Sequence, residues 1–397
     1  MVEAMRWALI SVFGAIVCGG TVAQAGATLG EPRRATLIGP GLVVETAPVA
    51  SLDRAGVTPV GGGRRDDLLA VWFEAGNGTP RSLSGSPARL RLTDGTVLEG
   101  DIDRSGARPD AVSWLHPVFG SIVISLDRAS WYEIDRTGAG FGRPPRDLEA
   151  DVVRFNNGDS VSGFVVSVGP EVELESDDGR VSRFPLDLVS AIGIANPDEP
   201  ATRAMLVTDS GSVVRVESVR VAGSGFSIDV RTRSEAGLIS WELPQDRVLG
   251  IVYQPHRLVA LSSLEPVSVE PLGTGLVRRK PVVVGEERPL LGSDVLFSGP
   301  MSASYACPGG SSVFACVAEM PESARLWGDC DFVVDADGVE LGRWRLHGGG
   351  PRVDVRVELP TGTERLGLRV APGRRGPVSD RVVLKWPMIE INAAGEP

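Results

Sequence analysis

In residues 90–100 the chain reads LRLTDGTVLEG, and in residues 153–163 it reads VRFNNGDSVSG. Both stretches alternate apolar and polar residues around an Asp-Gly or Asn-Gly pair. Such alternation is typical of a strand with one buried face. Asp-Gly or Asn-Gly between two such segments indicates a β-hairpin, because both central positions of a type I′ turn require positive φ. We therefore predict type I′ hairpin turns at Asp94-Gly95 and Asn157-Gly158.

These hairpins begin two longer repeats. Each repeat ends on a related segment, LDRASWYEI at 126–134 and LDLVSAIGI at 186–194, and a looser third copy starts at Met205. A unit with four or five short strands cannot bury both faces of a flat sheet, and curling into a barrel removes exposed edges. The expected architecture is all-β, with tandem small SH3-like or Sm-like β-barrels; stacked or linked three-stranded sheets are the alternative. The three repeats are placed at residues 88–137, 150–195 and 201–255.

Inside the second repeat the strand faces can be assigned. Residues 171–175 alternate strictly, which predicts that Val172 and Leu174 face inward, and Asp177-Asp178-Gly179 should turn the chain. Residues 26–87 read as an irregular N-terminal segment that could lend a strand to the first repeat. Its apolar stretches at 37–44 and 68–73 are the expected strands.

The first residues resemble an export signal. Arg6 precedes an apolar run at 7–18, and Ala23-Gln24-Ala25 supplies small residues for cleavage after Ala25 or Ala27. Cys18 leaves a lipid anchor open, although Val17 precedes it where a small residue is usual. No later stretch has the length of a transmembrane helix. We expect residues 1–25 to be a signal peptide, and an exported protein that is periplasmic, on the cell surface or extracellular.

Composition indicates a globular chain that does not bind nucleic acid. Of 397 residues, 42% are hydrophobic and 23% charged, and the net charge is −11. Nucleic-acid affinity depends largely on Lys and Arg neutralising phosphates. The basic clusters at 64–65, 278–280 and 374–375 lie beside Gly or Pro and are expected to be solvated loops. No cofactor motif is present.

Three cysteines follow the expected signal peptide: Cys307, Cys316 and Cys330. Alternation places Cys316 and Cys330 on apolar strand faces. They could form a disulfide or be small buried hydrophobic residues. CxxC metal-ligand spacing is absent, so no metal site is expected.

After a Pro-containing linker at 264–281, residues 281–393 show longer strands separated by Gly and Pro turns. This pattern predicts a jelly-roll β-sandwich. The expected strands are 313–318, 330–334, 339–346, 353–359, 365–370 and 382–391, with a tight turn at 335–338.

This C-terminal region resembles the NPCBM family, a module attached to glycoside hydrolases and found in secreted bacterial proteins. The likeness lies in RPLLG (288–292) with SASY (302–305), VFACVA (313–318), DFVVDADG (331–338), and SDR (379–381) followed by Trp386. Arg381 stands where the family often has histidine, and Trp386 falls two places late. The resemblance implies a galactose-binding-like sandwich, with carbohydrate binding as the family's proposed role.

The sequence shows no catalytic motif. His116, His256 and His347 are scattered, and neither HExxH nor GxSxG occurs, so we expect the protein not to be an enzyme. Sugar sites commonly combine an aromatic platform with a polar rim. Candidate platforms are Trp327, Trp344, Trp386 and Tyr305, and Trp344 shares the inward face with Leu346.

The ligand-binding rim is predicted at Arg343, Arg345, His347, Asp380 and Arg381, with Trp386; a solvated sheet face is the alternative for the three residues 343, 345 and 347. The arginines would favour an anionic glycan. The function expected is a secreted, non-catalytic binding protein for a glycan or envelope polymer. The alternative is a structural or protein-interaction scaffold of the cell envelope that binds an envelope protein.

Overall fold

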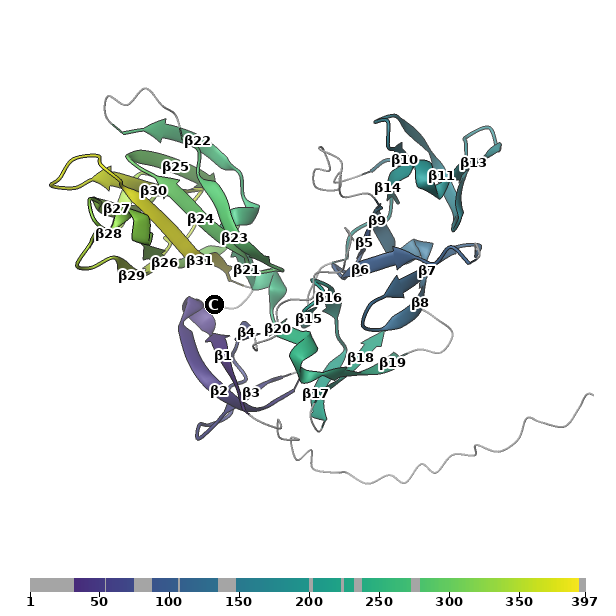
Figure 1. Ribbon diagram of the computed structural model, residues 1–397, viewed down its shortest axis with the longest axis horizontal. Coiled ribbons are helices and arrows are strands. Elements are labelled where there is room, and N and C mark those ends of the chain that lie inside the picture. The colour runs from purple at the N-terminus through teal and green to yellow at the C-terminus, as the bar shows by residue number, and fades with distance from the viewer. Residues whose placement is uncertain are drawn as a thin grey trace, which may run out of the picture.

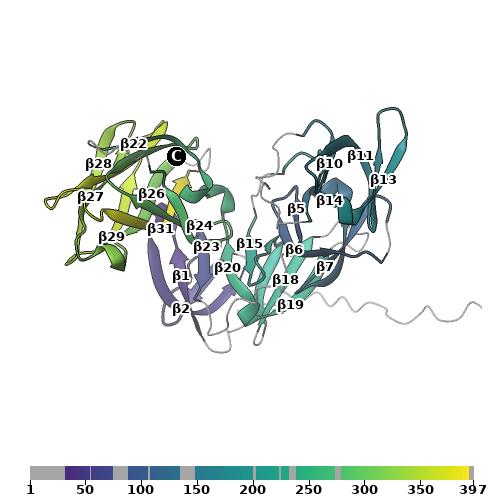
Figure 2. The same cartoon turned by 45° about the horizontal axis from the view of Figure 1, so that its top comes forward.

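The computed structural model describes residues 32–53, 55–74, 88–105, 108–134, 148–199, 203–222, 225–231, 238–272 and 279–392. The expected signal peptide at 1–25 lies outside these residues. Figures 1 and 2 show two arms that meet at a base. The C-terminal sandwich forms one arm, residues 88–193 form the other, and residues 33–73 lie with 205–252 in the base.

The described chain is all-β, as expected. Its helices are seven 3-10 turns of three residues each. No helix among the described residues has the length and hydropathy needed to cross a membrane. The turns are η1 (Pro40–Leu42), η2 (Leu126–Arg128), η3 (Leu186–Leu188), η4 (Gln245–Arg247), η5 (Pro255–Arg257), η6 (Leu261–Ser263) and η7 (Glu322–Ala324).

Twenty strands of residues 33–252 join in one hydrogen-bonded assembly. They are β1 (Arg33–Ile38), β2 (Val44–Asp53), β3 (Gly56–Pro59), β4 (Ala70–Phe73), β5 (Ala88–Leu92), β6 (Val97–Ile102), β7 (Ala111–His116), β8 (Gly120–Ser125), β9 (Ala129–Glu133), β10 (Asp151–Phe155), β11 (Ser160–Val168), β12 (Glu171–Glu175), β13 (Val181–Pro185), β14 (Val189–Gly193), β15 (Met205–Thr208), β16 (Val213–Arg215), β17 (Ser218–Ala222), β18 (Gly225–Arg231), β19 (Leu238–Pro244) and β20 (Val248–Val252).

The same pairing scheme appears in each of the three segments assigned to repeats. The first strand of each segment pairs with its second and its last strand, as β5 does with β6 and β9, and β10 with β11 and β14. In the third segment, β15 pairs with β16 and β20.

The strand ladders of the described residues form no closed barrel, so the structure does not show the expected SH3-like or Sm-like closure. Each closing strand instead pairs with the closing strand of another segment: β9 with β14, and β4 with β20. A strand edge that pairs with a neighbouring segment has no unpaired backbone groups left to satisfy by closing into a barrel.

The hairpins at 90–100 and 153–163 form as predicted, but their type I′ turns do not. Gly95 and Gly158 have φ of 84° and 91°, whereas Asp94 and Asn157 are not among the described residues with positive φ. A loop with positive φ at its glycine alone is compatible with a type I turn followed by a left-handed glycine. Positive φ at two consecutive residues occurs instead at Asp337 and Gly338, in the tight turn predicted at 335–338.

The N-terminal segment differs from its expected form. A single strand over 37–44 is wrong, because η1 turns the chain between β1 and β2, with Gly41 at φ 70°. The segment also lends no strand to the first repeat among the described residues. Its strands β2 and β4 pair with β17 and β20, which belong to the third segment.

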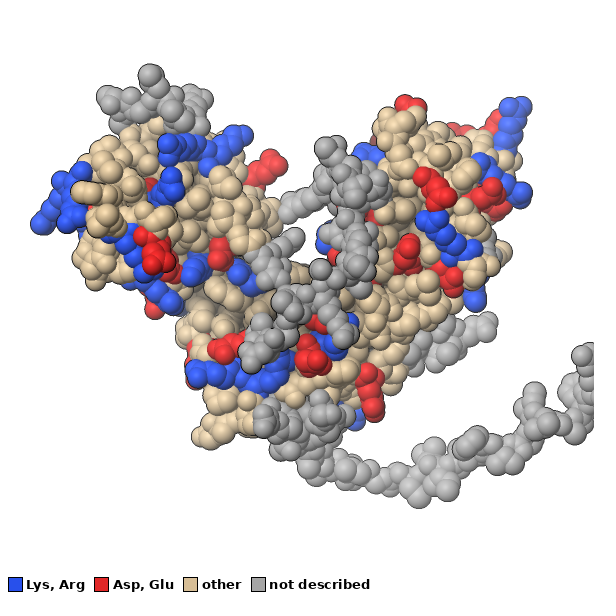
Figure 3. Space-filling view, in the orientation of Figure 1, with Lys and Arg blue, Asp and Glu red and all other residues tan. Residues whose placement is uncertain are grey.

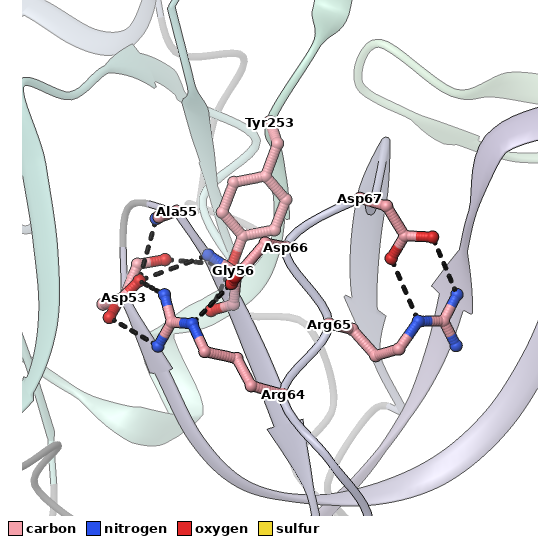
Figure 4. A network of polar contacts seen from close by, with 8 residues as sticks. All are labelled: Asp53, Ala55, Gly56, Arg64, Arg65, Asp66, Asp67 and Tyr253. Atoms are coloured by element: carbon pink, nitrogen blue, oxygen red, sulfur yellow. Dashed lines mark hydrogen bonds and ion pairs between the residues drawn. The ribbon is translucent and has the colours of Figure 1, made fainter.

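A polar network connects this N-terminal segment with Tyr253, the residue after β20 (Figure 4). The guanidinium of Arg64 donates two hydrogen bonds to the Asp53 carboxylate, at 2.9 and 2.7 Å, and Arg65 donates to Asp67 at 3.0 Å. The Tyr253 hydroxyl donates to the Asp53 carbonyl oxygen at 3.1 Å. The hydrogen bond from Arg64 lowers the pKa of Asp53. The basic pair at 64–65 is therefore neutralised by carboxylates.

Large side chains fill the core of the first assembly. The side chains of Trp114, Tyr132 and Phe226 are fully buried. Val172 and Leu174 are buried, as predicted from the alternation of their strand, and Gly179 has the positive φ of a turn.

On the surface, acidic and basic side chains lie beside one another at the base and on the 88–193 arm (Figure 3).

The C-terminal arm is a sandwich of two antiparallel sheets. The six-stranded sheet runs β23-β24-β31-β26-β29, with β21 also beside β31, and the five-stranded sheet runs β22-β25-β30-β27-β28. Phe297 and Phe314 of the first sheet and Phe332 of the second share one buried core. The strands are β21 (Leu258–Ala260), β22 (Pro266–Pro271), β23 (Val282–Arg288), β24 (Gly292–Ser298), β25 (Met301–Ala306), β26 (Ser311–Glu319), β27 (Asp329–Ala336), β28 (Val339–His347), β29 (Arg352–Glu358), β30 (Arg365–Pro372) and β31 (Arg381–Ile391).

The sandwich contacts the base through Glu390. Its carboxylate accepts a hydrogen bond from the Gly41 backbone N–H at 2.6 Å and pairs with Arg257 at 2.6 Å. Arg356 donates in return to the Gly41 carbonyl oxygen at 2.6 Å. The Glu390 side chain is 3% exposed. A buried charge with these partners ties β31 to η1 and η5.

Candidate functional site

One end of the sandwich gathers three loops around Asp329, the first residue of β27. These are residues 320–328 before β27, the turn at 347–350 after β28, and residues 373–380 between β30 and β31. The Asp329 carboxylate accepts from Arg345 Nε at 2.7 Å and from the Arg375 backbone N–H at 3.2 Å. Its carbonyl oxygen accepts the Gly373 N–H at 2.7 Å. Asp329 thus holds the loops together, and we call this region the Asp329 corner.

The electrostatics of Asp329 follow from these partners. Burial opposes its ionisation most strongly, but the hydrogen bond and the charge of Arg345, together with backbone N–H donors, outweigh burial, so that the pKa of Asp329 lies below its ordinary value. The same hydrogen bond raises the pKa of Arg345. Both groups are therefore charged at neutral pH, and the Arg345 guanidinium is held in one orientation.

The predicted arginine row is exposed along β28 and is ion-paired. Arg343 contacts Glu340 at 2.7 Å and Asp331 at 3.3 Å, and Arg345 also contacts Asp331 at 3.4 Å. On the neighbouring β30, Arg369 contacts Asp335 and Glu340, each at 3.5 Å. The row is a ladder of alternating charge rather than a cationic surface.

His347 ends this row at the tight turn. Its Nδ1 accepts a hydrogen bond from the Gly349 N–H at 3.1 Å, and its side chain is exposed. Gly348 has no room for a side chain, because a Cβ there would lie 2.5 Å from the Arg325 carbonyl oxygen. The turn is therefore packed against the loop that carries Trp327.

Asp380 lies beneath the corner and not on its rim. It is 1% exposed, and Oδ1 accepts the Asp329 N–H at 3.4 Å. Its Oδ2 has no hydrogen-bond partner among the described residues. Burial raises the pKa of Asp380 to about 6. Arg381 is exposed, but it lies on β31 opposite Ser298, in the other sheet.

Trp386 lies where the sandwich meets the base. Its ring lies 4.0 Å from the Arg288 guanidinium and forms an edge-to-face pair with Trp72 of β4, with ring centroids 6.2 Å apart. Trp386 has φ of 51°, and the register between β26 and β31 shifts between Ala315 and Val317. This irregularity of β31 accompanies the contact of Trp386 with the base.

Of the other candidate platforms, Trp327 is exposed. Its exposed fraction is 61%, and that of the adjacent Leu326 is 72%. Tyr305 is 2% exposed and belongs to the core. Trp344 is half-buried and packs against Phe332 with ring centroids 6.3 Å apart, which agrees with its predicted inward face. Arg375 Nη1 reaches the Leu326 carbonyl oxygen at 3.5 Å, which connects the two loops.

The disulfide between Cys316 and Cys330 that the sequence left open is not formed. Cys307, Cys316 and Cys330 are all free thiols, and Cys316 and Cys330 are buried. Burial raises the pKa of Cys330 to about 12. The alternative, small buried hydrophobic residues, describes both.

A serine–histidine contact that the sequence analysis missed joins two segments of the first assembly. His116 Nε2 lies 2.9 Å from Ser212 Oγ, and Nδ1 accepts the backbone N–H groups of Val118 and Phe119. The neutral ring therefore carries its proton on Nε2 and donates to Ser212. Burial lowers the pKa of His116 to about 3. This histidine holds strands together and has no free nitrogen to activate the serine.

No family model and no curated protein matches the sequence. Solved structures similar to the chain include the CBM51 of Clostridium perfringens GH95 in complex with methyl-galactose, at 17% identity over 33% of this chain and 99% of that one, with a TM-score of 0.27. Tandem CBM51 modules of a Streptococcus pneumoniae family 98 glycoside hydrolase match at 12% identity over 90% and 88%, with a TM-score of 0.26. A CBM6 of Clostridium stercorarium in complex with cellobiose matches at 15% identity over 34% and 93%, with a TM-score of 0.21. These neighbours are carbohydrate-binding modules.

Proposed function

We propose that the protein is an exported, non-catalytic binding protein whose sandwich recognises a glycan at the Asp329 corner. The observation that carries this proposal is the exposed Trp327, two residues before the Asp329 carboxylate that orients the guanidinium of Arg345. The NPCBM resemblance supports it. We assign residues 258–392 to the binding module, because β21 and β22 are strands of its two sheets.

Trp327 provides the apolar part of such a site. One face of a pyranose ring is largely C–H and packs on an indole, while the hydroxyls at the edge need hydrogen-bond partners. The sandwich buries its other large aromatic rings wholly or in part, which leaves Trp327 as its most exposed one among the described residues. Amphipathic aromatic rings combined with a few fixed polar groups are typical of ligand sites.

The polar part of the site favours a neutral glycan over the anionic one expected from the sequence. Arg343, Arg345 and Arg369 are matched by four carboxylates, Asp329, Asp331, Asp335 and Glu340. A uronic-acid carboxylate would meet these acidic groups. Sugar hydroxyls can both accept from guanidinium N–H groups and donate to carboxylate oxygens.

A glycan array probed with the full mature chain tests the proposal. Trp327→Ala should abolish binding to the neutral glycans that the wild type binds. Val339→Ala is the matched control, because Val339 is 67% exposed at the opposite end of β27 and β28, and it should leave binding unchanged. Equal binding by wild type and Trp327→Ala would place the site elsewhere. A wild-type chain that binds no glycan would favour the envelope scaffold.

A further inference from the structure

Two strands of the first assembly meet through a reciprocal contact. Val97 of β6 lies opposite Val213 of β16 in an antiparallel pair. The Glu99 N–H donates to Ser212 Oγ at 2.9 Å, and the Arg215 N–H donates to Thr96 Oγ1 at 3.1 Å. On each strand, the residue before the central valine accepts and the second residue after it donates. The contact therefore has the geometry of a local two-fold axis through the valine pair.

The corresponding positions in β11 follow from the turn that precedes each strand. Gly95, Gly158 and Gly211 have positive φ, and each donates its N–H to the carbonyl oxygen three residues before it. Counting from these glycines, Asp159 corresponds to Thr96 and Ser212. Ser160 corresponds to the two valines.

This edge of β11 has no neighbouring strand in the part of the chain that the structure describes. β11 pairs with β10 through residues 160–163 and with β12 from Phe164 onward, so the outer edge of 160–162 faces no strand among the described residues. Ser160 and Ser162 are exposed. Val161 is 40% exposed, whereas the corresponding Leu98 and Val214 are 4% and 2% exposed.

Two more exposed apolar side chains lie beyond the open edge, on the sheet face opposite to that of Val161. Phe164 and Val181 are 62% and 51% exposed, and both lie in register with Glu175 of the strand between them, so their side chains share one face. Exposed apolar residues that adjoin an unpaired strand edge are a recognised template for pairing with another chain.

We propose that this edge, residues 159–162 of β11, pairs with the same edge of a second copy of the chain. The edge is equivalent to one that pairs two-fold within the molecule, and a two-fold contact between identical surfaces needs only another copy. In the resulting dimer Ser160 lies opposite its own counterpart.

The residues at the edge suit such a pairing. The Asp159 carboxylate accepts in place of the hydroxyls of Thr96 and Ser212, and the partner's Ser162 N–H donates. In the present chain Asp159 Oδ2 accepts from Asn157 at 2.7 Å, which leaves Oδ1 available. The residues directly across the axis are serines, so like charges do not face each other there.

Cysteine crosslinking of the full mature chain tests the proposal. Ser160→Cys places two thiols across the axis and should give a disulfide-linked dimer under mild oxidation. Ser182→Cys is the control, since Ser182 is also exposed and lies on β13 of the same segment, away from the proposed edge. Sedimentation velocity should show a concentration-dependent dimer for the wild type, and Ser160→Lys should return it to monomer.

Each outcome decides the proposal. A wild-type chain that stays monomeric at the highest concentration reached, or Ser160→Cys that crosslinks no faster than Ser182→Cys, overturns it. A dimer that persists in Ser160→Lys with an unchanged midpoint of unfolding shows that the interface lies elsewhere.

Discussion

Asp380 should make the sandwich more stable as the pH falls. Its pKa in the folded protein is about 6, against an ordinary value of 3.8, because burial disfavours the carboxylate. The raised folded-state pKa means that the folded chain binds the proton more tightly than the unfolded chain. The ionised group therefore destabilises the fold fully above pH 6, and this cost disappears as the pH falls through 6 toward 4.

The size of the effect follows from the shift. About two pKa units at 1.36 kcal/mol each correspond to about 3 kcal/mol as an upper estimate. Asp380→Asn removes the ionisation while keeping an oxygen that can accept the Asp329 N–H. The free energy of unfolding of the variant should exceed that of the wild type by about 1–3 kcal/mol at pH 8, and this difference should disappear near pH 4.

Urea unfolding of both proteins at pH 8, 6 and 4 measures this difference, because other titrating groups cancel between wild type and variant. Asp354→Asn is the control, because it makes the same chemical change at an exposed position: the Asp354 side chain is 84% exposed on β29. A gap between Asp380→Asn and wild type that stays constant from pH 8 to pH 4 would refute a buried, unpaired carboxylate.

Three further predictions concern stability. Gly158→Val should cost about 1–3 kcal/mol in urea unfolding, since a β-branched residue is forced to positive φ although no atom lies within 4 Å of the added Cβ; an unchanged midpoint would contradict the turn. Glu390→Ala should lower the free energy of unfolding by about 3 kcal/mol, because the largely buried Arg257 loses its carboxylate and the Gly41 N–H loses its acceptor. Limited proteolysis should then cleave the chain between the sandwich and the base faster than in the wild type. Cleavage at the wild-type rate would argue against this junction. Adding a reductant should leave the thermal midpoint unchanged, because the described cysteines are free; a drop would reveal a disulfide.

Local patterns in the sequence predicted local structure well. The hairpins at 90–100 and 153–163, the inward Val172 and the C-terminal strands depend on alternation and glycine, which act over a few residues. The type I′ turn predicted at Asp94-Gly95 was wrong, because a hairpin loop that is one residue longer needs positive φ only at its glycine. The expected linker at 264–281 contains β22, an edge strand with Pro266 and Pro271 at its two ends, a position where proline is tolerated.

The residues of the predicted ligand-binding rim lie in different places in the structure, for a different reason. Arg345 and His347 are two residues apart on one strand and therefore share a face, so their exposure could be predicted from β28 alone. Asp380 is buried and Trp386 faces Trp72 because of contacts with chain segments far away in sequence. No pattern within β31 or the loop before it encodes these contacts. Trp327 was a candidate, but its exposure depends on how the loop packs against Gly348.

The pairing of β4 with β20 has a consequence for how the chain folds. Trp72 lies opposite Gly250, so the N-terminal strands cannot complete their sheet until residues 248–252 have been synthesised and brought to them. Contacts between residues so distant in sequence form late and slowly. Residues 88–193 pair among themselves and can fold in the interval. A chain emerging from its N-terminus would therefore hold β1–β4 unpaired at their outer edge for longest, and a chaperone that shields strand edges would act there first.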